Sequence, residues 1–181
     1  ISRTILVCLA SGSCRIHETF SSVPKNDKPL RFMQFLKAHI KGCRIADCKQ
    51  IGNERIIQLD LSRGNEKLLM FIRLWSGASN IIVTDSNLKI LDVFFRRPKR
   101  NEITGGTFVI PEVRPLDDSE KEKFLTVRSF DDVKTKNNTF NEKVDLWYKE
   151  NAQSLSIQSL REQALKHYTS QKARMESALT K

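Results

Sequence analysis

A charged pair, Glu54 and Arg55, stands where an apolar run begins in the stretch GNERIIQLDLSRGNEKLLMFIRLWSGASNIIVTD, residues 52–85. The guanidinium of Arg55 is a planar fork of donors that fits a phosphate or a base edge. Glu54 could accept a hydrogen bond from a base amino group, or hold Arg55 in place. The alternative is a solvated strand end, with Arg55 lying along the strand and Glu54 as its counter-charge. The first interpretation predicts a contact surface for a charged partner.

The overall charge favours an anionic partner. Lys and Arg number 31 against 21 Asp and Glu, which gives a formal net charge of +10 over 181 residues. Such a surplus suits nucleic acid, a ribosome surface or acidic lipid, although many soluble basic proteins bind no anion specifically. The densest positive cluster consists of Arg96, Arg97, Lys99 and Arg100. The alternative for this cluster is a solvated turn.

Other classes of function are disfavoured by the motifs. No stretch approaches the roughly 20 apolar residues that cross a bilayer, and no secretory signal is visible, although a chain that begins with Ile1 is expected to be a fragment. The four cysteines are spaced C-x5-C and C-x4-C, unlike zinc sites, so we predict reduced thiols and no metal. No nucleophile elbow, phosphate loop or fitting carboxylate pair is present, so we predict neither an enzyme nor a cofactor.

The elements that must position these residues are mostly short strands. Apolar runs at 3–9 and 15–20 predict two strands. Apolar residues at helical spacing, followed by Gly42 as a stop, predict a helix over 28–41. Five further strands are predicted at 44–51, 55–61, 67–75, 80–85 and 89–95. Their short links require antiparallel neighbours, which predicts a meander with the helix as its cover.

The C-terminal part changes character. The polar segment 116–138 is interpreted as a linker with a short helical turn, which leaves 1–115 as one β-rich domain. The sequence TFNE that begins at Thr139 fits a capping box. No Gly or Pro follows, and a three-four spacing of apolar residues predicts a helical coiled-coil segment over 139–181, with a kink or a change of face at 155–157. A helix this polar needs the domain, another helix or a second copy of the chain to stabilise it.

Several stretches occur in an order that resembles a known family. They are ILVCLASGSCRIHET, PLRFMQFLKAHIKGCRI, QIGNERIIQLDL, SNIIVTDSNLKILDV and ITGGTFVIPEVRP. In this order they resemble the second part of the N-terminal domain of the NFACT family, also called fibronectin-binding protein A N-terminal domain. TFNEKVDLWYKENAQ resembles the start of that family's coiled coil. The resemblance covers most of residues 3–181.

The resemblance implies a fold and a function. The family's N-terminal domain looks like that of formamidopyrimidine-DNA glycosylases, a β-sandwich with flanking helices, so the expected fold class is α+β. Family members act in ribosome-associated quality control, bind an obstructed large ribosomal subunit that holds peptidyl-tRNA, and recruit tRNA for template-free tailing. The implied function is a cytoplasmic, non-catalytic RNA-binding module whose partners are tRNA and the large ribosomal subunit, with self-association of the coiled coil as a further expectation.

The resemblance also implies site residues. A family Asp-Arg pair associated with tRNA engagement aligns with Glu54 and Arg55, and the family's RIH aligns at Arg15 and His17, for which a sheet residue and a satisfied histidine are the alternative. Asn80 ends the segment SGASN, where the family has Gly-Arg-His-Ser-Asn. The predicted RNA-binding residues are Glu54, Arg55, Arg15, His17, Asn80, Arg96, Arg97, Lys99 and Arg100. The chain departs from the family in Glu at position 54, and in lacking the first helix and strands, the helix-hairpin-helix modules and the C-terminal domain.

Two other functions are weighed against RNA binding. The family's older name implies an adhesin that binds fibronectin, and the missing secretory signal argues against it. A glycosylase-type enzyme would need an N-terminal amine nucleophile and a nearby acid, and this chain offers no such arrangement. RNA binding is therefore the predicted function, with the adhesin as the alternative.

Overall fold

The computed structural model describes residues 2–75, 77–113, 115, 117–125 and 129–179, apart from the side chains of residues 120 and 123–125. Two compact units make up the chain: unit 1 comprises Ile1–Ser21 and Ser129–Lys181, and unit 2 comprises Ser22–Arg128. This division differs from the segments 1–115, 116–138 and 139–181 suggested by composition. The first strands group with the C-terminal helices because side chains of the α3 helix (Phe140–Glu150) hydrogen-bond to residues 18 and 19.

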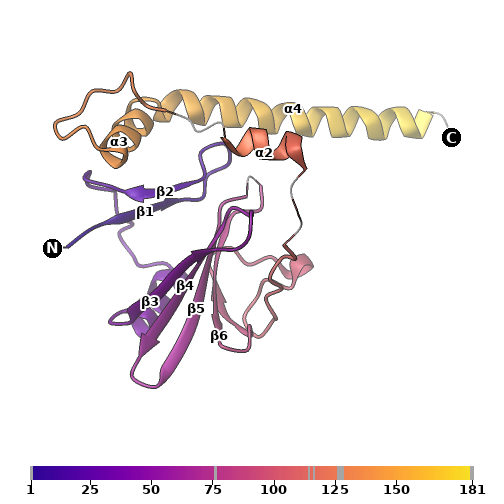
Figure 1. Cartoon of the computed structure of the whole chain (residues 1–181). Helices are drawn as coiled ribbons and strands as arrows, with labels where there is room; N and C mark the ends of the chain where they lie inside the picture. Colours follow the sequence, from indigo (N-terminus) through magenta and orange to yellow (C-terminus); the bar gives the residue numbers. More distant parts are fainter. Residues whose placement is uncertain (1, 76, 114, 116, 126–128, 180–181) are drawn as a thin grey trace. The chain divides into compact units, whose positions relative to one another are not determined.

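Unit 2 is built on a five-stranded antiparallel sheet in the sequential order β3-β4-β5-β6-β7 (Figure 1). The strands are β3 (Arg44–Gln50), β4 (Ile56–Arg63), β5 (Glu66–Arg73), β6 (Asn80–Asp85) and β7 (Ile90–Val93). Each strand pairs with the next one in the chain, because the links are too short for a parallel crossover. The predicted meander and the α+β class are confirmed.

The core of unit 2 lies on one face of this sheet. Phe71, Ile82 and Val93 are opposite one another on three neighbouring strands and are fully buried. Phe108 covers them, with its ring centroid 4.3 Å from that of Phe71. The segment that carries Phe108 is held beside β7, since Ile90 donates to the carbonyl of Gly106 at 2.7 Å. This segment, rather than the predicted helix, therefore closes the core.

The helix predicted over 28–41 forms in two parts. The α1 helix (Arg31–Phe35) continues as a π-helical turn, η1 (Leu36–Ile40), and Gly42 ends it with a φ of +84°. Phe32 is buried against the ring of Phe94, and Arg31 bonds to Asp92. The helix thus packs at β7 and its end. It does not cover the core as expected, because it is short and its one buried residue meets Phe94 rather than the core cluster.

Unit 1 combines a hairpin with two helices. The hairpin is formed by β1 (Ile5–Cys8) and β2 (Arg15–Glu18), which are antiparallel. The helices are α3 (Phe140–Glu150) and α4 (Ala152–Leu179). A small core of Phe130, Val133 and Val144 stabilises α3. The predicted linker therefore supplies two core residues, Phe130 and Val133. It also contains the helix α2 (Asp118–Leu125), and its residues 126–128 lie outside the described part.

The long helix breaks earlier than predicted. The spacing predicts a kink or a change of face at 155–157, whereas α3 ends at Glu150 and α4 begins at Ala152. Asn151 lies at the break with φ of −97° and ψ of 7°, outside the helical range, and its side-chain amide also donates to the carbonyl of Trp147 at 2.9 Å. In α4, no described residue is buried, and residues 180–181 lie outside the described part. No described helix has the length and apolarity to cross a membrane.

Candidate nucleic-acid interface

The predicted pair Glu54 and Arg55 occupies a tight turn between β3 and β4. Ile51 is buried in the core, and its carbonyl accepts from the backbone N–H of Glu54 at 2.9 Å. Gly52 has a φ of +50°, and a Cβ at this position would come within 2.7 Å of Val113. A side chain here would be both strained and crowded, so the turn requires glycine. The backbone that carries Arg55 is thus held in place.

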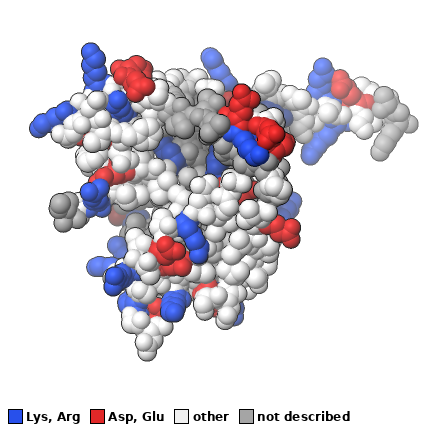
Figure 2. Space-filling model, in the orientation of Figure 1, with Lys and Arg blue, Asp and Glu red and all other residues white. Residues whose placement is uncertain are grey.

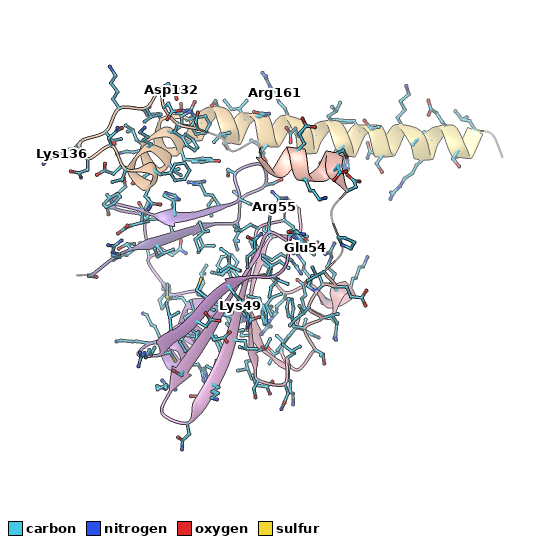
Figure 3. All side chains as sticks on the ribbon, in the orientation of Figure 1. Lys49, Glu54, Arg55, Asp132, Lys136 and Arg161 are labelled. Carbon is cyan, nitrogen blue, oxygen red and sulfur yellow. The ribbon has the colours of Figure 1, made fainter. Side chains whose placement is uncertain are left out.

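The side chain of Arg55 is exposed at the start of β4 (Figure 3). Its carbonyl accepts from the N–H of Leu74 at 2.8 Å, which ties it to the end of β5. Among the described residues, its guanidinium makes no hydrogen bond or ion pair, and the half-buried Glu54 forms no ion pair with it. Within the described residues Glu54 therefore neither holds Arg55 in place nor pairs with it, and the exposure of Arg55 fits both a contact surface and a solvated strand end. Arg55 presents its donors to solvent.

The basic cluster at 96–100 lies at the same end of this sheet. In an antiparallel meander, alternate strands begin and end at the same end of the sheet. The pairings of Ile56 with Arg73 and of Arg73 with Asn80 therefore place the start of β4, the end of β5, the start of β6 and the end of β7 at one end. Residues 94–102 follow β7 directly, and we call them the 94–102 loop. Strand spacing places its base roughly 14 Å from the start of β4. The fold thus brings together groups that are about 40 residues apart in sequence.

Three cations of the 94–102 loop are exposed, namely Arg96, Lys99 and Arg100. The last two belong to a 3-10 turn, η2 (Pro98–Arg100), which ends at Asn101 with a left-handed φ of +56°. Together with Arg55, these three residues form what we call the sheet-end cationic surface. These four exposed cations lie at one end of the sheet, where each can pair with a phosphate group.

Asn80 is not part of that surface. Its side chain is fully buried, and its amide donates to the carbonyl of Phe95 at 2.9 Å and to the carboxylate of Glu102 at 2.8 Å. Its oxygen accepts from the backbone N–H of Phe95 at 2.8 Å. Its donors and acceptor are used inside the protein, so the predicted direct contact with RNA does not fit. Asn80 instead anchors the 94–102 loop.

Arg97 is also drawn partly inward. Its guanidinium is 3.8 Å from the carboxylate of Glu102, and its side chain is 25% exposed. The same carboxylate accepts from buried Arg73 at 2.6 Å. Sequence reasoning missed both Arg73 and Glu102. The available signal was a charged residue inside the apolar run KLLMFIRLW, because a cation there needs a buried partner.

The other two predicted residues, Arg15 and His17, belong to unit 1. His17 is buried and its Nε2 lies 3.2 Å from Asp145 on α3. Arg15 lies over the ring of Tyr148, with 3.8 Å from its guanidinium carbon to the ring centroid. These contacts match the alternative interpretation, a sheet residue and a satisfied histidine. Both residues fasten β2 to α3.

Asp145 is the centre of this contact and was not predicted. It accepts from the hydroxyls of Thr19 at 2.8 Å and Ser21 at 2.9 Å, and from the backbone of Phe20 at 3.2 Å. Burial raises the pKa of this carboxyl, but the hydrogen bonds outweigh burial, and the pKa is below its usual value. Asp145 is therefore a charged structural residue.

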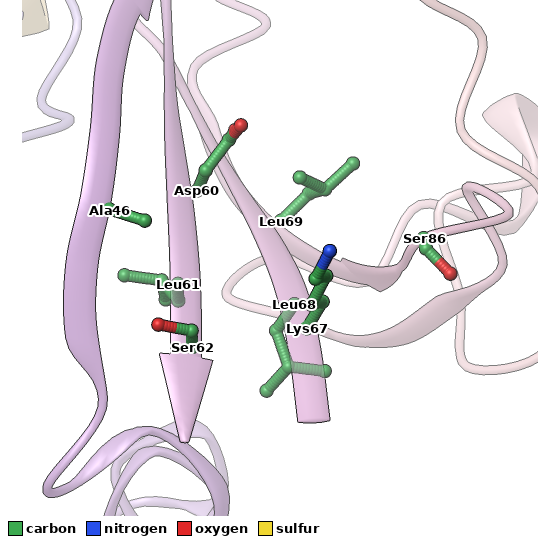
Figure 4. Close-up of a pocket in the computed structure, with 8 residues that line it drawn as sticks. All are labelled: Ala46, Asp60, Leu61, Ser62, Lys67, Leu68, Leu69 and Ser86. Atoms are coloured by element: carbon green, nitrogen blue, oxygen red, sulfur yellow. The ribbon is translucent and has the colours of Figure 1, made fainter. Parts of the chain in front are cut away.

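A pocket of about 310 Å³ lies at the opposite end of the sheet, near the β4–β5 hairpin (Figure 4). Its only carboxylate among the described lining residues, Asp60, accepts from Gln58 at 2.6 Å, and Lys67 also lines it. No three potential metal ligands converge among the described residues. On the face drawn in Figure 2, basic and acidic side chains are interspersed. The sheet-end cationic surface is therefore the strongest candidate for a binding site.

The sequence of this chain is similar to those of known proteins. A family described as "NFACT N-terminal and middle domains" matches residues 2–135. The human protein named ribosome quality control complex subunit NEMF is 29% identical over 126 residues, which are 69% of this chain and 11% of that protein. The Rqc2 homolog RqcH of Streptococcus pneumoniae is 28% identical over 108 residues, which are 54% of this chain and 20% of that protein. The chain therefore spans a small part of the length of these relatives.

Solved structures share the fold. The fibrinogen binding protein from Staphylococcus aureus aligns with a TM-score of 0.52 and 25% identity, over 61% of this chain and 41% of that one. The N-terminal domain of the fibronectin-binding protein PavA from Streptococcus pneumoniae aligns with a TM-score of 0.55 and 19% identity, over 88% of this chain and 66% of that one. The likeness to PavA is evidence of common fold alone.

Proposed function

The chain belongs to the NFACT family, and we propose that it is a non-catalytic RNA-binding module of a ribosome quality-control factor, with tRNA and the large ribosomal subunit as its partners. The relatives named as ribosome quality-control proteins support this role. Because the chain spans only part of their length, the activity of those whole proteins is part of the proposal. A cytoplasmic location and the absence of a cofactor belong to it as well.

The sheet-end cationic surface carries the proposal. Its four exposed cations come from two segments that the fold brings to one end of the sheet. Within the described residues, the guanidinium of Arg55 donates to no acceptor of the protein. Released counterions make such contacts favourable for any polyanion, and a planar guanidinium adds directed hydrogen bonds to phosphate or a base edge. Contact rather than chemistry is the function we propose, and in the pocket near the β4–β5 hairpin the carboxylate of Asp60 already accepts from Gln58.

Two finer points of architecture also remain proposals. Similarity of the sheet to the N-terminal domain of formamidopyrimidine-DNA glycosylases is one. The other is a coiled coil formed by α4, with self-association of the chain as its consequence. The apolar side chains of α4 support it, since Leu160 is 62% and Tyr168 67% exposed, and a partner helix would bury them.

The proposal is tested by reversing one charge. We expect Arg55→Glu to weaken tRNA binding about 10-fold and to lower the slope of log affinity against log salt by about one, because one phosphate contact is lost. Arg44→Glu is the matched control: it makes the same change on an exposed residue at the other end of the sheet. Binding is measured by fluorescence anisotropy at several salt concentrations, and the thermal midpoint is measured for each variant.

The midpoint separates binding from folding. Arg55 is exposed, so its reversal should leave the thermal midpoint nearly unchanged. Equal losses of affinity for the two variants would mean that only net charge matters, and the assigned site would be wrong. An intact fold with unchanged tRNA affinity in Arg55→Glu would contradict the proposal directly.

Fibronectin binding is the second candidate. The solved relatives are named for binding fibrinogen or fibronectin, which is the observation in its favour. A cationic surface could also bind an acidic matrix protein. Surface plasmon resonance on immobilised fibronectin separates the two functions: saturable binding there, with no binding to tRNA, would favour the adhesin.

A further inference from the structure

The 94–102 loop places an exposed pair of aromatic rings beside its cations. Phe94 is 40% and Phe95 42% exposed, and their ring centroids are 4.7 Å apart in an edge-to-face arrangement. Arg96 follows them at once and is exposed. Exposed aromatic rings next to cations are the composition of surfaces that bind single-stranded nucleic acid, where bases stack on the rings and cations bind the backbone.

The two rings differ in what holds them. Phe94 packs edge-to-face on buried Phe32, with 5.6 Å between their centroids, and so is part of the fold. The ring of Phe95 contacts the ring of Phe94, and the guanidinium of Arg97 lies 5.7 Å from its centroid. The two rings are about equally exposed, and Phe95 is the one that does not pack on buried Phe32, so we take Phe95 as the ring that a ligand would contact.

The backbone beneath Phe95 is fixed from inside the protein. Buried Asn80 accepts from its N–H at 2.8 Å and donates to its carbonyl at 2.9 Å. Asn80 also donates to buried Glu102, which pairs with buried Arg73 at 2.6 Å. The loop is closed at its base as well, because the N–H of Arg97 donates to the carbonyl of Glu102 at 2.9 Å.

This network is a costly way to hold an exposed loop. Three buried polar side chains, two of them charged, must lose their water for it to form. The result is a loop whose exposed ring and cations are already ordered, which lowers the entropy cost of binding. Such preorganisation is expected if the ring of Phe95 itself contacts a bound ligand.

We propose that Phe95 is a stacking platform for an unpaired RNA base and that Arg96, Lys99 and Arg100 bind the phosphates flanking that base. The inference rests on the proposed RNA-binding function and narrows it to an unpaired segment of the RNA. Paired bases are stacked within a duplex and show no free face, whereas unpaired bases can splay onto an aromatic ring. Stacking is largely independent of base identity, so the site is expected to be tolerant of sequence.

The experiment compares two probes on the intact chain. One is a fluorescent single-stranded RNA of about a dozen nucleotides, and the other is the fully paired duplex of the same sequence. Phe95→Leu keeps an apolar side chain of similar size but removes the π face, and Phe95→Trp restores it. Phe20→Ala is the control for loss of an exposed phenyl ring elsewhere, because Phe20 is 61% exposed in unit 1.

We expect Phe95→Leu to weaken binding of the single strand about 5- to 160-fold, a range set by the usual contribution of one stacked base. Duplex affinity and the salt slope should stay unchanged, since no charge is removed. Phe95→Trp should restore binding of the single strand, and Phe20→Ala should bind both probes normally.

Each failure has its own meaning. If Phe95→Leu binds the single strand normally while removal of the cations at 96, 99 and 100 weakens it, stacking is wrong and the RNA-binding function stands. Equal losses for single strand and duplex would also overturn stacking. If the unmodified chain binds neither probe nor tRNA, the proposed function fails and this inference fails with it.

Discussion

The charged groups of Asp145 and Arg55 have opposite surroundings in this chain: one is hydrogen-bonded within the protein and the other is exposed. Asp145 accepts hydrogen bonds from two hydroxyls, a histidine and a backbone N–H, all from the segment 17–21. Arg55 makes no such bonds within the described residues and is exposed. The first charge stabilises unit 1, and the second is available to a partner. Residue type alone does not distinguish these roles, because Asp145 and Arg55 are both charged residues that lie beside short strands.

Replacement of Asp145 should reveal its contribution through pH. The folded-state pKa lies below the ordinary value, so the carboxylate stabilises the fold fully above about pH 4 and loses this effect as pH falls through the lowered pKa. We expect Asp145→Asn to lose about 1–3 kcal/mol at neutral pH, since an amide nitrogen would face donors that need an acceptor. The gap to the unmodified chain should shrink in acid.

Urea denaturation monitored by circular dichroism across a pH series measures this gap. Asp132→Asn is the control, because Asp132 is an exposed residue of the same unit (Figure 3), and its stability should match that of the unmodified chain. A gap that stays constant down to about pH 2 would show that the carboxylate charge is not responsible.

The α3 helix shows how one element is started and positioned. The hydroxyl of Thr139 accepts from the N–H of Glu142 at 3.3 Å, as the predicted capping box requires. The reciprocal half is different: the carboxylate of Glu142 accepts from Asn137 and Thr135. The hydrogen bond from the Asn137 side chain is the largest cause of the lowered pKa of Glu142. The cap thus also fixes the preceding turn.

Loss of the cap should weaken α3. Thr139→Ala is expected to cost about 1 kcal/mol, because the N–H of Glu142 loses its acceptor. Thr169→Ala is the matched control in exposed α4, where alanine is the better helix former and stability should not fall. The free energy of unfolding and hydrogen exchange of the α3 amides provide the measurement. A loss of stability as large in the control as at the cap would refute the assignment.

At the scale of the whole molecule, two separate cores support the two units. Phe71 and its neighbours form the core of unit 2, while Phe130, Val133 and Val144 form that of unit 1. The candidate interface lies entirely in unit 2. Its position at one end of the sheet therefore depends on the core of that unit alone.

Separate cores predict separate responses to core mutations. Phe71→Ala should cost about 3–5 kcal/mol and accelerate amide exchange in β4 to β7, because a fully buried ring is removed. Exchange in α3 should remain slow. Phe130→Ala is the reciprocal variant and should show the opposite pattern. If each variant accelerates exchange in both units equally, the chain unfolds as one cooperative body.

The sequence by itself determined the elements and their order. Alternating apolar runs and links of a few residues specify antiparallel strands through interactions between near neighbours, and the capping residue and Gly42 mark helix ends in the same local way. The exposed cations of the candidate site were also accessible to this reasoning, since the side chains of Arg55, Lys99 and Arg100 make no ion pair with a distant residue in the part of the chain that the structure describes.

Only the tertiary structure decided which polar residues are buried. Asn80 meets Glu102 and Phe95, and Arg73 meets Glu102 across 29 residues of sequence. His17 meets Asp145 across 128 residues. Local patterns carry no information about such partners, because burial of a polar group is decided by whether the fold supplies a distant hydrogen-bond partner. Apolar spacing likewise does not show which apolar segment will cover a sheet, and here Phe108 closes the core rather than the helix over 28–41, because the fold holds the segment of Phe108 beside β7.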